Sequence, residues 1–550
     1  MLFDPTRRSA LKHSGLALAS AVAVFAPREL AAQSGSASIA HSSFLDVRVY
    51  GAAGDGKTVD SPAINRAIDA AAAKGGGTVL FPAGTYLSFS IRLRSHVQLR
   101  LESGATILAA DSPLPGETTG YNGGTYDAAE PKTAWNAYQD YGHNHWHNSL
   151  IWGEGLENCS IIGPGLIWGK GLSNGRTAPH GRLGYRFLAG QAGVGNKAIA
   201  LKNCRNVVLR DFAILKGGHF GLLLTGVDNL TIDNLTIDTD RDGMDIDCCR
   251  NVRVTHCVVN SPWDDGICPK SSFALGEARS TDNLMISNCY VTGTYQLGSV
   301  IDGTFKKFGV VSDPELRPGY TGGIKCGTES NGGFRNVVIS NCVFEGCKGL
   351  AFEAVDGALL EDVAVSNITM RDVITCPLFL RLGARLRGPV ATTKIGELRR
   401  ILVSNLVSYN TASVISSIVS GIPESSLEDI KLSNIFVQHV GGASRETVDV
   451  HPPELAKEYP EPIKFGPTPG QGFFFRHVKR LEVSHTEVQP VVPDPRPAFY
   501  LEDVDRADFI AVSAPKGQPA FSLHNVTDFR VAASRAAPDV TIETAENGTL

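Results

Sequence analysis

A short pattern that recurs along the chain decides the fold. It reads NCRNVVL at Asn203–Leu209, VDNLTI at Val227–Ile232 and CRNVRV at Cys249–Val254. The central asparagines, Asn206, Asn229 and Asn251, are 23 and 22 residues apart. Each unit contains a polar turn, a short strand, an Asn-centred turn and a second short strand. A period of about 22 residues with short strands and no helices predicts a parallel β-solenoid.

The same step recurs toward the end of the chain. Further copies lie at Asp282–Ile286, Arg335–Ile339, Glu361–Val365, Leu427–Leu432 and, more weakly, Val478–Val483. Strands one repeat apart pair at about 4.8 Å, so we expect interior ladders of Val, Ile, Leu, Cys and Asn. A leucine-rich repeat has a similar period, but its fixed leucine pattern is missing here. The sequence therefore predicts an all-β, single-stranded, right-handed parallel β-helix.

Residues 1–32 have the pattern of an export signal. Arg7 and Arg8 precede an apolar stretch, residues 15–26, that is too short to span a bilayer. The heptapeptide Thr6–Lys12 resembles a twin-arginine signal, which exports folded proteins. An ordinary secretory signal is the alternative. We expect a periplasmic or secreted protein that does not contact the membrane once the signal is removed.

The rest of the chain divides into three predicted segments. Apolar spacing over Ser61–Lys74 predicts a helix that caps the open end of the solenoid, within a segment of cap and first coils at 44–108. Residues 109–475 are predicted to form the catalytic β-helix, and 476–550 its closing coils. Loops on the binding face are predicted at 112–148, 294–322 and 441–470. Surface loops without a role are the alternative.

Composition excludes several classes of protein. Charged residues make up 19% and hydrophobic residues 43%, which excludes a disordered chain and a coiled coil. The net charge of −5, without a long basic run, predicts no nucleic-acid partner. The 11 cysteines include no Cys-x-x-Cys pair, and Asn-Cys steps such as that at Cys204 predict buried structural thiols. We expect a monomer with no cofactor and no metal.

Two acidic clusters lie one repeat apart. DRDGMDID at Asp240–Asp247 is followed by WDDGIC at Trp263–Cys268. This separation predicts that Asp242 lies beside Asp264 and Asp265 on the neighbouring coil. Crowded carboxylates drive their pKa values apart, which is what acid–base hydrolysis of a glycosidic bond needs. A calcium site and Asp side chains that cap turns are the alternatives.

These clusters resemble motifs of glycoside hydrolase family 28, the polygalacturonase family. The likeness is to its Asn-Thr-Asp-Gly and Asp-Asp motifs, while Asp46–Lys57 and Phe81–Tyr86 resemble the N-terminal cap of bacterial members. The resemblance implies a right-handed β-helix and hydrolysis with inversion at the anomeric carbon. It also implies that Asp264 is the general acid, and that Asp242 and Asp265 activate water.

The chain departs from this family in two motifs. The family's Gly-His-Gly motif falls at residues 321–328, where Gly322 stands at the His position. Its Arg-Ile-Lys motif falls at residues 351–353, where Ala351 and Glu353 replace the cations that would bind the galacturonate carboxylate. We therefore expect ordinary galacturonate recognition to be lost at that subsite.

Further residues are candidates for contacting the substrate. Lys325 lies in the altered motif, and Lys270 follows the Asp pair. Arg381 and Arg385 belong to a basic cluster, and further candidates lie in the His-rich loop GHNHWH at 142–147. For the basic residues, structural ion pairs or a solvated surface are the alternatives. The His-rich loop could instead be a plain surface loop or bind a metal, and His219 could be a buried structural histidine. The predicted substrate-binding residues are His145, Trp146, His219, Lys270, Lys325, Glu329, Glu353, Arg381 and Arg385.

The sequence predicts an exported hydrolase of pectic polysaccharide or oligosaccharide. Rhamnogalacturonan or decorated galacturonan fits the altered motifs better than plain polygalacturonate. A calcium-dependent lyase on the same fold, with Lys325 as its base and the Asp cluster as its metal site, is one alternative. A non-catalytic carbohydrate-binding β-helix is the other. Hydrolysis leaves a saturated new reducing end, a lyase leaves an unsaturated end, and a binding protein leaves neither.

Overall fold

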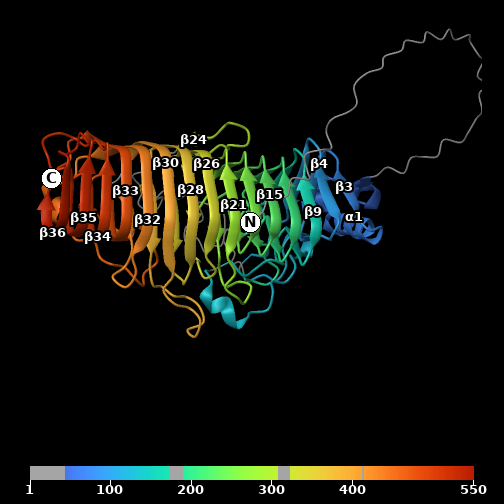
Figure 1. Ribbon diagram of the computed structural model, residues 1–550. Coiled ribbons are helices and arrows are strands. Elements are labelled where there is room, and N and C mark those ends of the chain that lie inside the picture. The colour runs from blue at the N-terminus through green and yellow to red at the C-terminus, as the bar shows by residue number, and fades with distance from the viewer. Residues whose placement is uncertain (1–43, 115, 141, 174–189, 308–321, 412–413) are drawn as a thin grey trace, which may run out of the picture. The chain divides into compact units, whose positions relative to one another are not determined.

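Short strands stack coil upon coil along one axis, as the period predicts (Figure 1). The computed structural model describes residues 44–114, 116–140, 142–173, 190–307, 322–411 and 414–550. The predicted export signal at 1–32 lies outside these residues, as does part of the predicted loop at 294–322. Parallel pairing continues from β1 to β35, and the predicted parallel β-helix is confirmed.

Three parallel sheets run along the solenoid. The first contains β5 (Ile91–Arg92), β8 (Ile151–Glu154), β11 (Ile199–Lys202), β14 (Leu222–Thr225), β17 (Met244–Asp247), β20 (Ile267–Lys270), β25 (Ile324–Cys326), β27 (Leu350–Ala354), β29 (Leu378–Leu382) and β31 (Ser417–Ser420). The second contains β1 (Phe44–Asp46), β3 (Gly77–Phe81), β6 (Val97–Leu101), β9 (Glu157–Ile162), β12 (Arg205–Arg210), β15 (Asp228–Asp233), β18 (Arg250–Thr255) and β21 (Thr281–Ser287). The third contains β2 (Asp55–Val59), β4 (Gly84–Ser88), β7 (Ala105–Ala109), β10 (Leu166–Trp168), β13 (Ala213–Leu215), β16 (Thr236–Asp238), β19 (Val258–Asn260) and β22 (Tyr290–Thr292).

Beyond β22 the second and third sheets continue as long strands. β21 and β22 both pair with β26, so one strand spans what two strands span in earlier coils. The long strands are β26 (Phe334–Glu345), β28 (Leu359–Arg371), β30 (Glu397–Thr411), β32 (Leu427–Gly441), β33 (Phe473–Val492), β34 (Phe499–Ile510), β35 (Phe521–Ala532) and β36 (Val540–Thr549). The start of β33 also pairs with β31 and continues the first sheet. A separate antiparallel hairpin joins β23 (Tyr295–Leu297) to β24 (Lys306–Lys307).

The two ends of the solenoid are closed differently. At the N-terminal end the predicted helix is confirmed as α1 (Ser61–Ala73), which packs against β3 and the 3-10 helix Val47–Tyr50 (Figure 1). Pro62 lies in the first turn of the helix, and the side chains of Ile64 and Ile68 are fully buried. At the other end β36 pairs antiparallel with β35. No helix among the described residues is long and apolar enough to cross a membrane.

The repeated asparagines form a ladder, but on the outside of the coils. Asn206, Asn229, Asn251 and Asn283 have φ angles of 53° to 57°, a left-handed conformation that Asn tolerates. Asn229 Nδ2 donates to Asn206 Oδ1 at 2.8 Å, and Asn283 Nδ2 donates to Asn251 Oδ1 at 2.9 Å. All four are exposed, so the prediction of an interior Asn ladder is wrong. The residue is needed because the corner requires a left-handed backbone.

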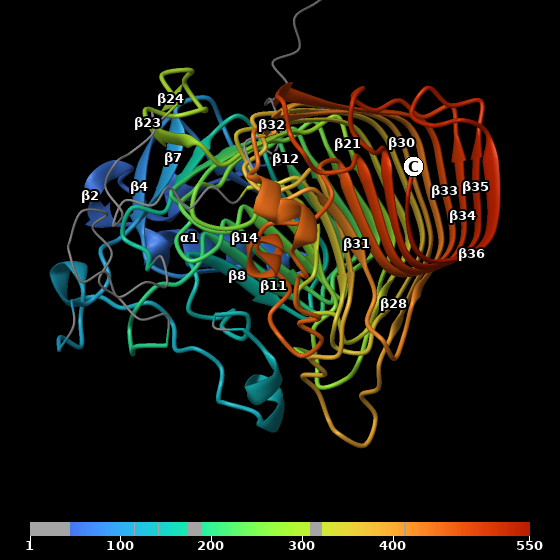
Figure 2. The same ribbon diagram turned by 90° about the vertical axis from the view of Figure 1, so that its left-hand side faces the viewer.

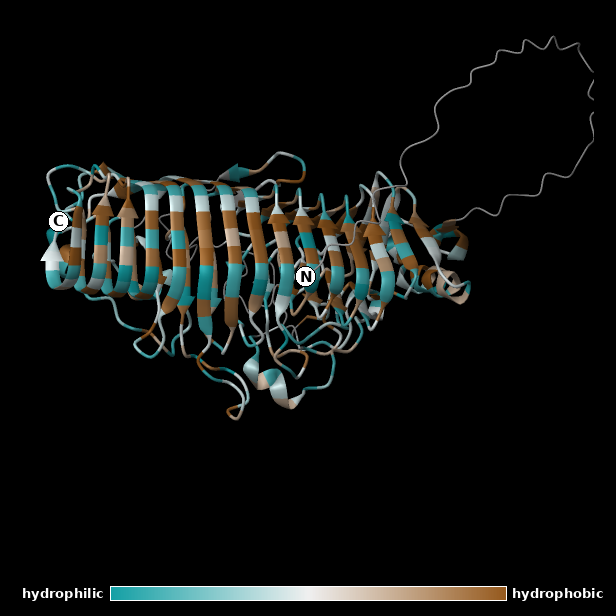
Figure 3. Cartoon of the chain, viewed as in Figure 1, coloured by the Kyte–Doolittle hydropathy of each residue, from teal (hydrophilic) through white to brown (hydrophobic). Residues whose placement is uncertain are grey.

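The interior contains aliphatic, aromatic and cysteine side chains. Val207, Leu230, Val252 and Leu284 lie in register on successive coils and are buried in one continuous core. All 11 cysteines are free and buried, which confirms the predicted structural thiols. Figure 3 shows the result on the sheets, where hydrophobic and hydrophilic bands alternate along each strand.

Two of the predicted loops lie over the first sheet. The segment 112–148 contains the 3-10 helices Tyr121–Gly123 and Ala134–Tyr138, and 441–470 contains Arg445–Asp449 and Pro462–Phe465. Trp135 Nε1 donates to the carbonyl of Ala274 at 3.2 Å, which ties the first segment to the loop after β20. In Figure 2, which is turned by 90° from Figure 1, these segments lie beside the solenoid rather than inside it.

Candidate active site

Strand alternation presents a row of polar side chains on the outer face of the first sheet. In β17, Met244 and Ile246 point into the core, so Asp245 and Asp247 point outward. The same rule makes Lys270 of β20, Lys325 of β25 and Glu353 of β27 outward residues. The segments 112–148 and 441–470 cover this row, and most of its members are therefore buried.

Asp242 and Asp265 lie at equivalent places just before β17 and β20. Gly243 N donates to Asp265 O at 2.9 Å, which sets the two coils in register. Carboxylate oxygens of Asp242 and Asp265 lie within 4.8 Å of each other, and both residues are buried. Asp264 joins them through Arg241, whose Nη2 is 2.6 Å from Asp264 Oδ2. The three predicted catalytic aspartates thus lie together on neighbouring coils.

Their surroundings drive two of the pKa values apart. Burial, together with the charges of Asp264 and Asp245, raises the pKa of Asp242 well above its usual range. Burial also raises the pKa of Asp264, but Arg241, Lys325 and Lys270 outweigh burial and lower it to about 2. Asp264 is therefore ionised at neutral pH, and of these two carboxyl groups Asp242 is the one that holds its proton to higher pH.

Two buried lysines flank the cluster. Lys325 Nζ lies 2.5 Å from Asp265 Oδ2, and Lys270 Nζ lies 4.0 Å from Asp245 Oδ1. Burial lowers both lysine pKa values, but the neighbouring carboxylates outweigh it and hold them well above the usual range. Both lysines are therefore cations, and neither is a ready general base.

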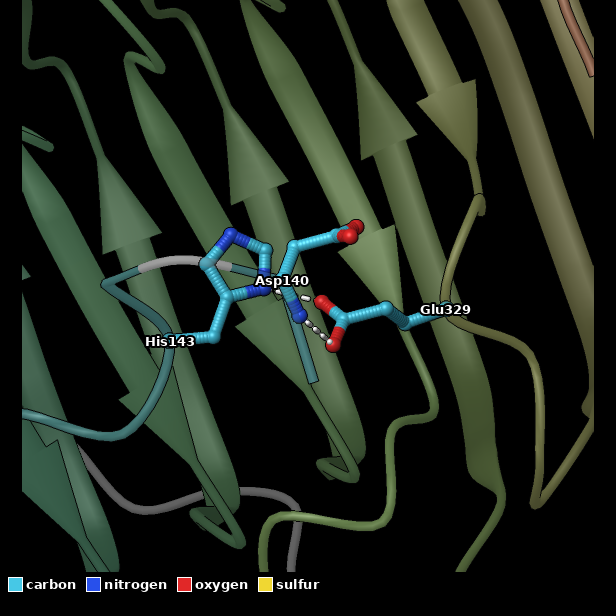
Figure 4. Close-up of side chains that lie close together, drawn as sticks. All are labelled: Asp140, His143 and Glu329. Atoms are coloured by element: carbon cyan, nitrogen blue, oxygen red, sulfur yellow. Dashed lines mark hydrogen bonds and ion pairs between the residues drawn. The ribbon is translucent and has the colours of Figure 1, made fainter. Parts of the chain in front are cut away.

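A third group enters the site from the segment 112–148 (Figure 4). His143 is buried, with its Nδ1 bonded to Glu329 Oε2 and its Nε2 3.4 Å from Asp245 Oδ2. Glu329 Oε1 also accepts from the backbone N–H of Asp140 at 2.9 Å. Burial raises the pKa of Glu329, but His143 outweighs it, so the pKa is lowered overall. The predicted residue Glu329 thus contacts the loop rather than open solvent.

Possible metal ligands also meet in this region. Ligand atoms lie within 4.8 Å of one another in three sets of described residues: Asp140–His143–Glu329, His143–Asp242–Asp245 and Asp242–Asp265–Cys268. These side chains already have partners within the protein, since Arg387 binds Asp140, Lys325 binds Asp265, and His143 contacts Glu329 and Asp245. These sets are consequently explained as networks of ion pairs.

The other predicted residues of the His-rich loop hold it in place. Trp146 is buried, donates from Nε1 to Thr225 Oγ1 at 3.2 Å, and packs with Phe220 and Leu223. It is an anchor, not the exposed platform that sugar stacking requires. Burial lowers the pKa of the partly buried His145 to about 4.

His219 is fully buried beneath the same loop. Its ring lies 4.4 Å from that of Phe220, and burial lowers its pKa well below the usual range. Gly142 passes directly over it at φ 90°, and a Cβ on Gly142 would meet the His219 ring at 2.6 Å. The alternative of a buried histidine therefore describes His219 better than a residue that lines an open cleft.

The altered Arg-Ile-Lys motif forms a narrow polar pocket. Glu353 is buried beside Lys325 and Lys348, in a pocket also lined by Thr375 and Glu461. Burial raises the pKa of Glu353 to about 8, although Lys325 opposes the rise. Glu353 is consequently mostly protonated at neutral pH, so it repels a substrate carboxylate less than an ionised glutamate would.

Both predicted arginines bind the protein itself. Arg381 is buried and donates to Ser420 Oγ at 2.9 Å, to the Gly421 carbonyl at 2.8 Å and to the Glu454 carbonyl at 2.5 Å. These bonds anchor the segment 441–470, which explains why a buried arginine occurs here. Arg385 pairs with Asp356 at 2.5 Å and lies 5.5 Å from the centre of the Tyr459 ring.

Sequence reasoning missed five residues of the site: Asp140, Arg241, His143, Asp245 and Tyr459. Asp245 was recoverable, since alternation along a strand that begins at Met244 makes it an outward residue. Asp140 and Tyr459 lie in loops without a repeat, and no sequence pattern relates them to the aspartates. His143 was visible only as one of three loop histidines.

Two family models match the chain. Residues 44–136 match a model described as rhamnogalacturonase A/epimerase, pectate lyase-like, and residues 156–274 and 197–374 match the right handed beta helix region. The chain is therefore a right-handed parallel β-helix with an acidic cluster on one sheet, and its N-terminal segment is similar to pectate-lyase-like proteins. The predicted hand of the helix is confirmed.

Two known proteins are similar to parts of the chain. The chain is 26% identical over 279 residues to a probable polygalacturonase of Vitis vinifera, which covers 46% of this chain and 51% of that protein. It is 56% identical over 66 residues to the plasmin and fibronectin-binding protein A of Streptococcus pneumoniae, which covers 12% of this chain and 9% of that protein. The matches thus span about half, or less, of these relatives.

A solved structure has the same fold. The family 28 exopolygalacturonase of Yersinia enterocolitica superposes with a TM-score of 0.55 and 17% identity, covering 90% of this chain and 79% of that one. The superposition shows the shared fold, and the polygalacturonase relative confirms the resemblance to the polygalacturonase family.

Proposed function

We propose that the protein is an exported glycoside hydrolase that cleaves pectic polysaccharide or oligosaccharide with inversion at the anomeric carbon. The observation that carries this proposal is the pair Asp242 and Asp264, on neighbouring coils with pKa values driven apart. One carboxyl group that keeps its proton beside one that is ionised is the requirement for acid–base hydrolysis. The similarity to polygalacturonase supports the substrate class and, together with the similarity to the plasmin and fibronectin-binding protein, supports export.

The electrostatics of the free protein favour a particular division of roles. Asp242 would donate its proton to the leaving oxygen, and ionised Asp264 would accept a proton from the attacking water. This reverses the role that the family resemblance implies for Asp264. The side chain of Asp264 is 28% exposed, so water can reach it, whereas Asp265 is buried and bound to Lys325. Lys325 then fixes Asp265 and helps keep Asp264 ionised.

The pocket around Glu353 supports a neutral sugar at that subsite. A protonated carboxyl group donates a hydrogen bond to a hydroxyl, and Ala351 offers no charge to a uronate. Rhamnogalacturonan or decorated galacturonan therefore suits the site better than plain polygalacturonate. Because the segments 112–148 and 441–470 cover the aspartates, we expect cleavage at chain ends rather than inside the chain.

A screen of the purified protein on defined pectic fragments tests this proposal. Saturated new reducing ends, lost in Asp264→Asn, are the expected result. Ultraviolet-absorbing unsaturated ends would instead identify a lyase, although Lys325, held protonated by Asp265, is a poor base for that reaction. No turnover of any fragment would contradict the hydrolase proposal.

Binding without catalysis is the second candidate function. The observation that favours it is the 56% identity over 66 residues to a plasmin and fibronectin-binding protein. Calorimetry with the same pectic fragments separates the two, because a binding protein retains its ligand without producing new ends. Asp264→Asn would then leave the affinity unchanged, within about twofold.

A further inference from the structure

We propose that His143 is a positioning residue for the catalytic aspartates, linking Glu329 to Asp245 and Asp242. This role presupposes the hydrolase activity proposed above. It assigns to the segment 112–148 a part in the chemistry as well as in covering the site.

The geometry places His143 in the middle of a chain of buried groups. Its Nδ1 contacts Glu329 on one side, and its Nε2 lies 3.4 Å from Asp245 Oδ2 on the other. Ligand atoms of His143, Asp242 and Asp245 all lie within 4.8 Å of one another. The order of contacts is therefore Glu329, His143, Asp245, Asp242, and it ends at the proposed proton donor.

The surrounding protein fixes the imidazole in this position. The ring lies 4.9 Å from that of Phe220, with the two planes inclined at 64°. Asp140, three residues earlier, donates its backbone N–H to Glu329 and binds Arg387 Nη1 through its carboxylate at 2.5 Å. The loop is thereby held on the same glutamate that holds the ring, so a small shift of His143 is resisted from two directions.

The chain of contacts gives His143 a way to act on Asp242. Glu329 is the acceptor for the Nδ1 proton, which leaves Nε2 directed at Asp245. Burial raises the pKa of Asp245 overall, and the charges of Lys270 and His143 oppose that rise. An ionised Asp245 in turn raises the pKa of Asp242. His143 therefore favours a state in which Asp245 is charged and Asp242 keeps the proton.

Several charged groups act on this network from different elements, and each contributes to its pH dependence. Lys270 of β20 faces Asp245, and His219 lies close enough to His143 for the charge of His143 to lower its pKa. The titratable groups around His143 are Asp140, His219, Asp242, Asp245, Lys270 and Glu329.

The test compares two histidines of one loop. His143→Gln removes the ring from the chain of contacts, while His147→Gln changes a partly exposed histidine that pairs with Glu154 at 2.9 Å. We expect His143→Gln to lower kcat on the order of 10²-fold with KM unchanged within about twofold. The alkaline limb of its pH–rate profile moves to lower pH, because Asp242 loses its proton more easily. His147→Gln should keep kcat, KM and the alkaline limb near those of the wild type.

A substrate-free measurement checks the same contact. In ¹⁵N-histidine spectra of the whole protein, the resonance lost in His143→Gln should shift in Glu329→Gln, because the Nδ1 acceptor is changed. Thermal unfolding shows that each variant is folded. An unshifted resonance, or an unchanged alkaline limb in an active His143→Gln, overturns the inference while Asp264→Asn still reports on the proposed function. If neither the wild type nor any variant turns over substrate, the proposed hydrolase function is contradicted. The spectra then test the contact between His143 and Glu329 by themselves.

Discussion

The guanidinium of Arg241 lies 2.6 Å from the carboxylate of Asp264, on the next coil of the solenoid. Arg241 immediately precedes Asp242, so a single coil supplies both a cation to Asp264 and the carboxyl group whose pKa is raised. The separation of the two pKa values is therefore a consequence of the register between neighbouring coils.

The first prediction concerns which aspartate donates the proton. Asp242→Asn and Asp264→Asn should each lower turnover of a natural pectic fragment by about 10²–10⁴-fold. A glycoside with a good aryl leaving group needs little protonation, so Asp242→Asn should recover most of its activity on that substrate and Asp264→Asn should not. Initial rates on both substrates measure this. Recovery by Asp264→Asn instead would restore the role implied by the family.

The second prediction concerns Arg241. Because Arg241 helps to hold the pKa of Asp264 at about 2, Arg241→Gln should raise that pKa toward its ordinary value. Asp264 is needed as an anion, so the acidic limb of the pH–rate profile should move to higher pH. The exposed Arg253→Gln, on β18 away from the aspartates, serves as a control. An acidic limb that stays in place in Arg241→Gln would contradict this account of Asp264.

The third prediction concerns stereochemistry. In an inverting hydrolase, an acid protonates the leaving oxygen and a base activates water on the opposite face of the sugar. The two carboxyl groups are then roughly 6.5–9.5 Å apart. NMR of the first minutes of hydrolysis should therefore show the inverted anomer before mutarotation. A product with retained configuration would exclude the proposed pair of roles.

The fourth prediction concerns substrate preference. Without the Arg-Ile-Lys cations, catalytic efficiency on polygalacturonate should be lower than on rhamnogalacturonan oligosaccharides by roughly two orders of magnitude, since a charge-assisted contact contributes about 1.5–3 kcal/mol. Early products should be short, because the covered site favours chain ends. Rapid internal cutting of polygalacturonate, seen by size analysis, would contradict both statements.

The fifth prediction concerns stability. Glu353 has a pKa of about 8 in the folded protein against 4.5 normally, so the folded state binds the extra proton between these values. Its contribution to stability is present below about pH 4.5 and is lost as the pH rises toward 8. Glu353→Gln should therefore raise Tm relative to the wild type by a few degrees at pH 8 and by less at pH 5. The exposed Glu397→Gln should show no such difference.

The sequence was informative where the repeat applies. The period of 22 to 23 residues predicted the stacked coils, and the same arithmetic placed Asp242 beside the Asp264–Asp265 pair. The sequence pattern could not show that Asn229 lies at a corner of the coil instead of in the core, because its place depends on the φ angle that the residue adopts. Nor could it distinguish Arg381 as an anchor from a ligand for substrate, since both uses require a cation on the same face.

The part of the site outside the repeat depends on contacts between remote segments. Asp140 and Arg387 are 247 residues apart, and no local pattern pairs them. The ionisation of Asp264 was also beyond sequence reasoning, because the neighbours that outweigh its burial, Arg241 and Lys325, lie on different coils.

That contact between Asp140 and Arg387 has a consequence for how the protein matures. Early coils can stack while the ribosome is still synthesising later ones, because each coil needs only its neighbour. The segment that carries His143, however, has no Arg387 to bind until several further coils have been made. The contacts that hold this segment over the aspartates are therefore completed late in biogenesis, after the coils beneath it have stacked.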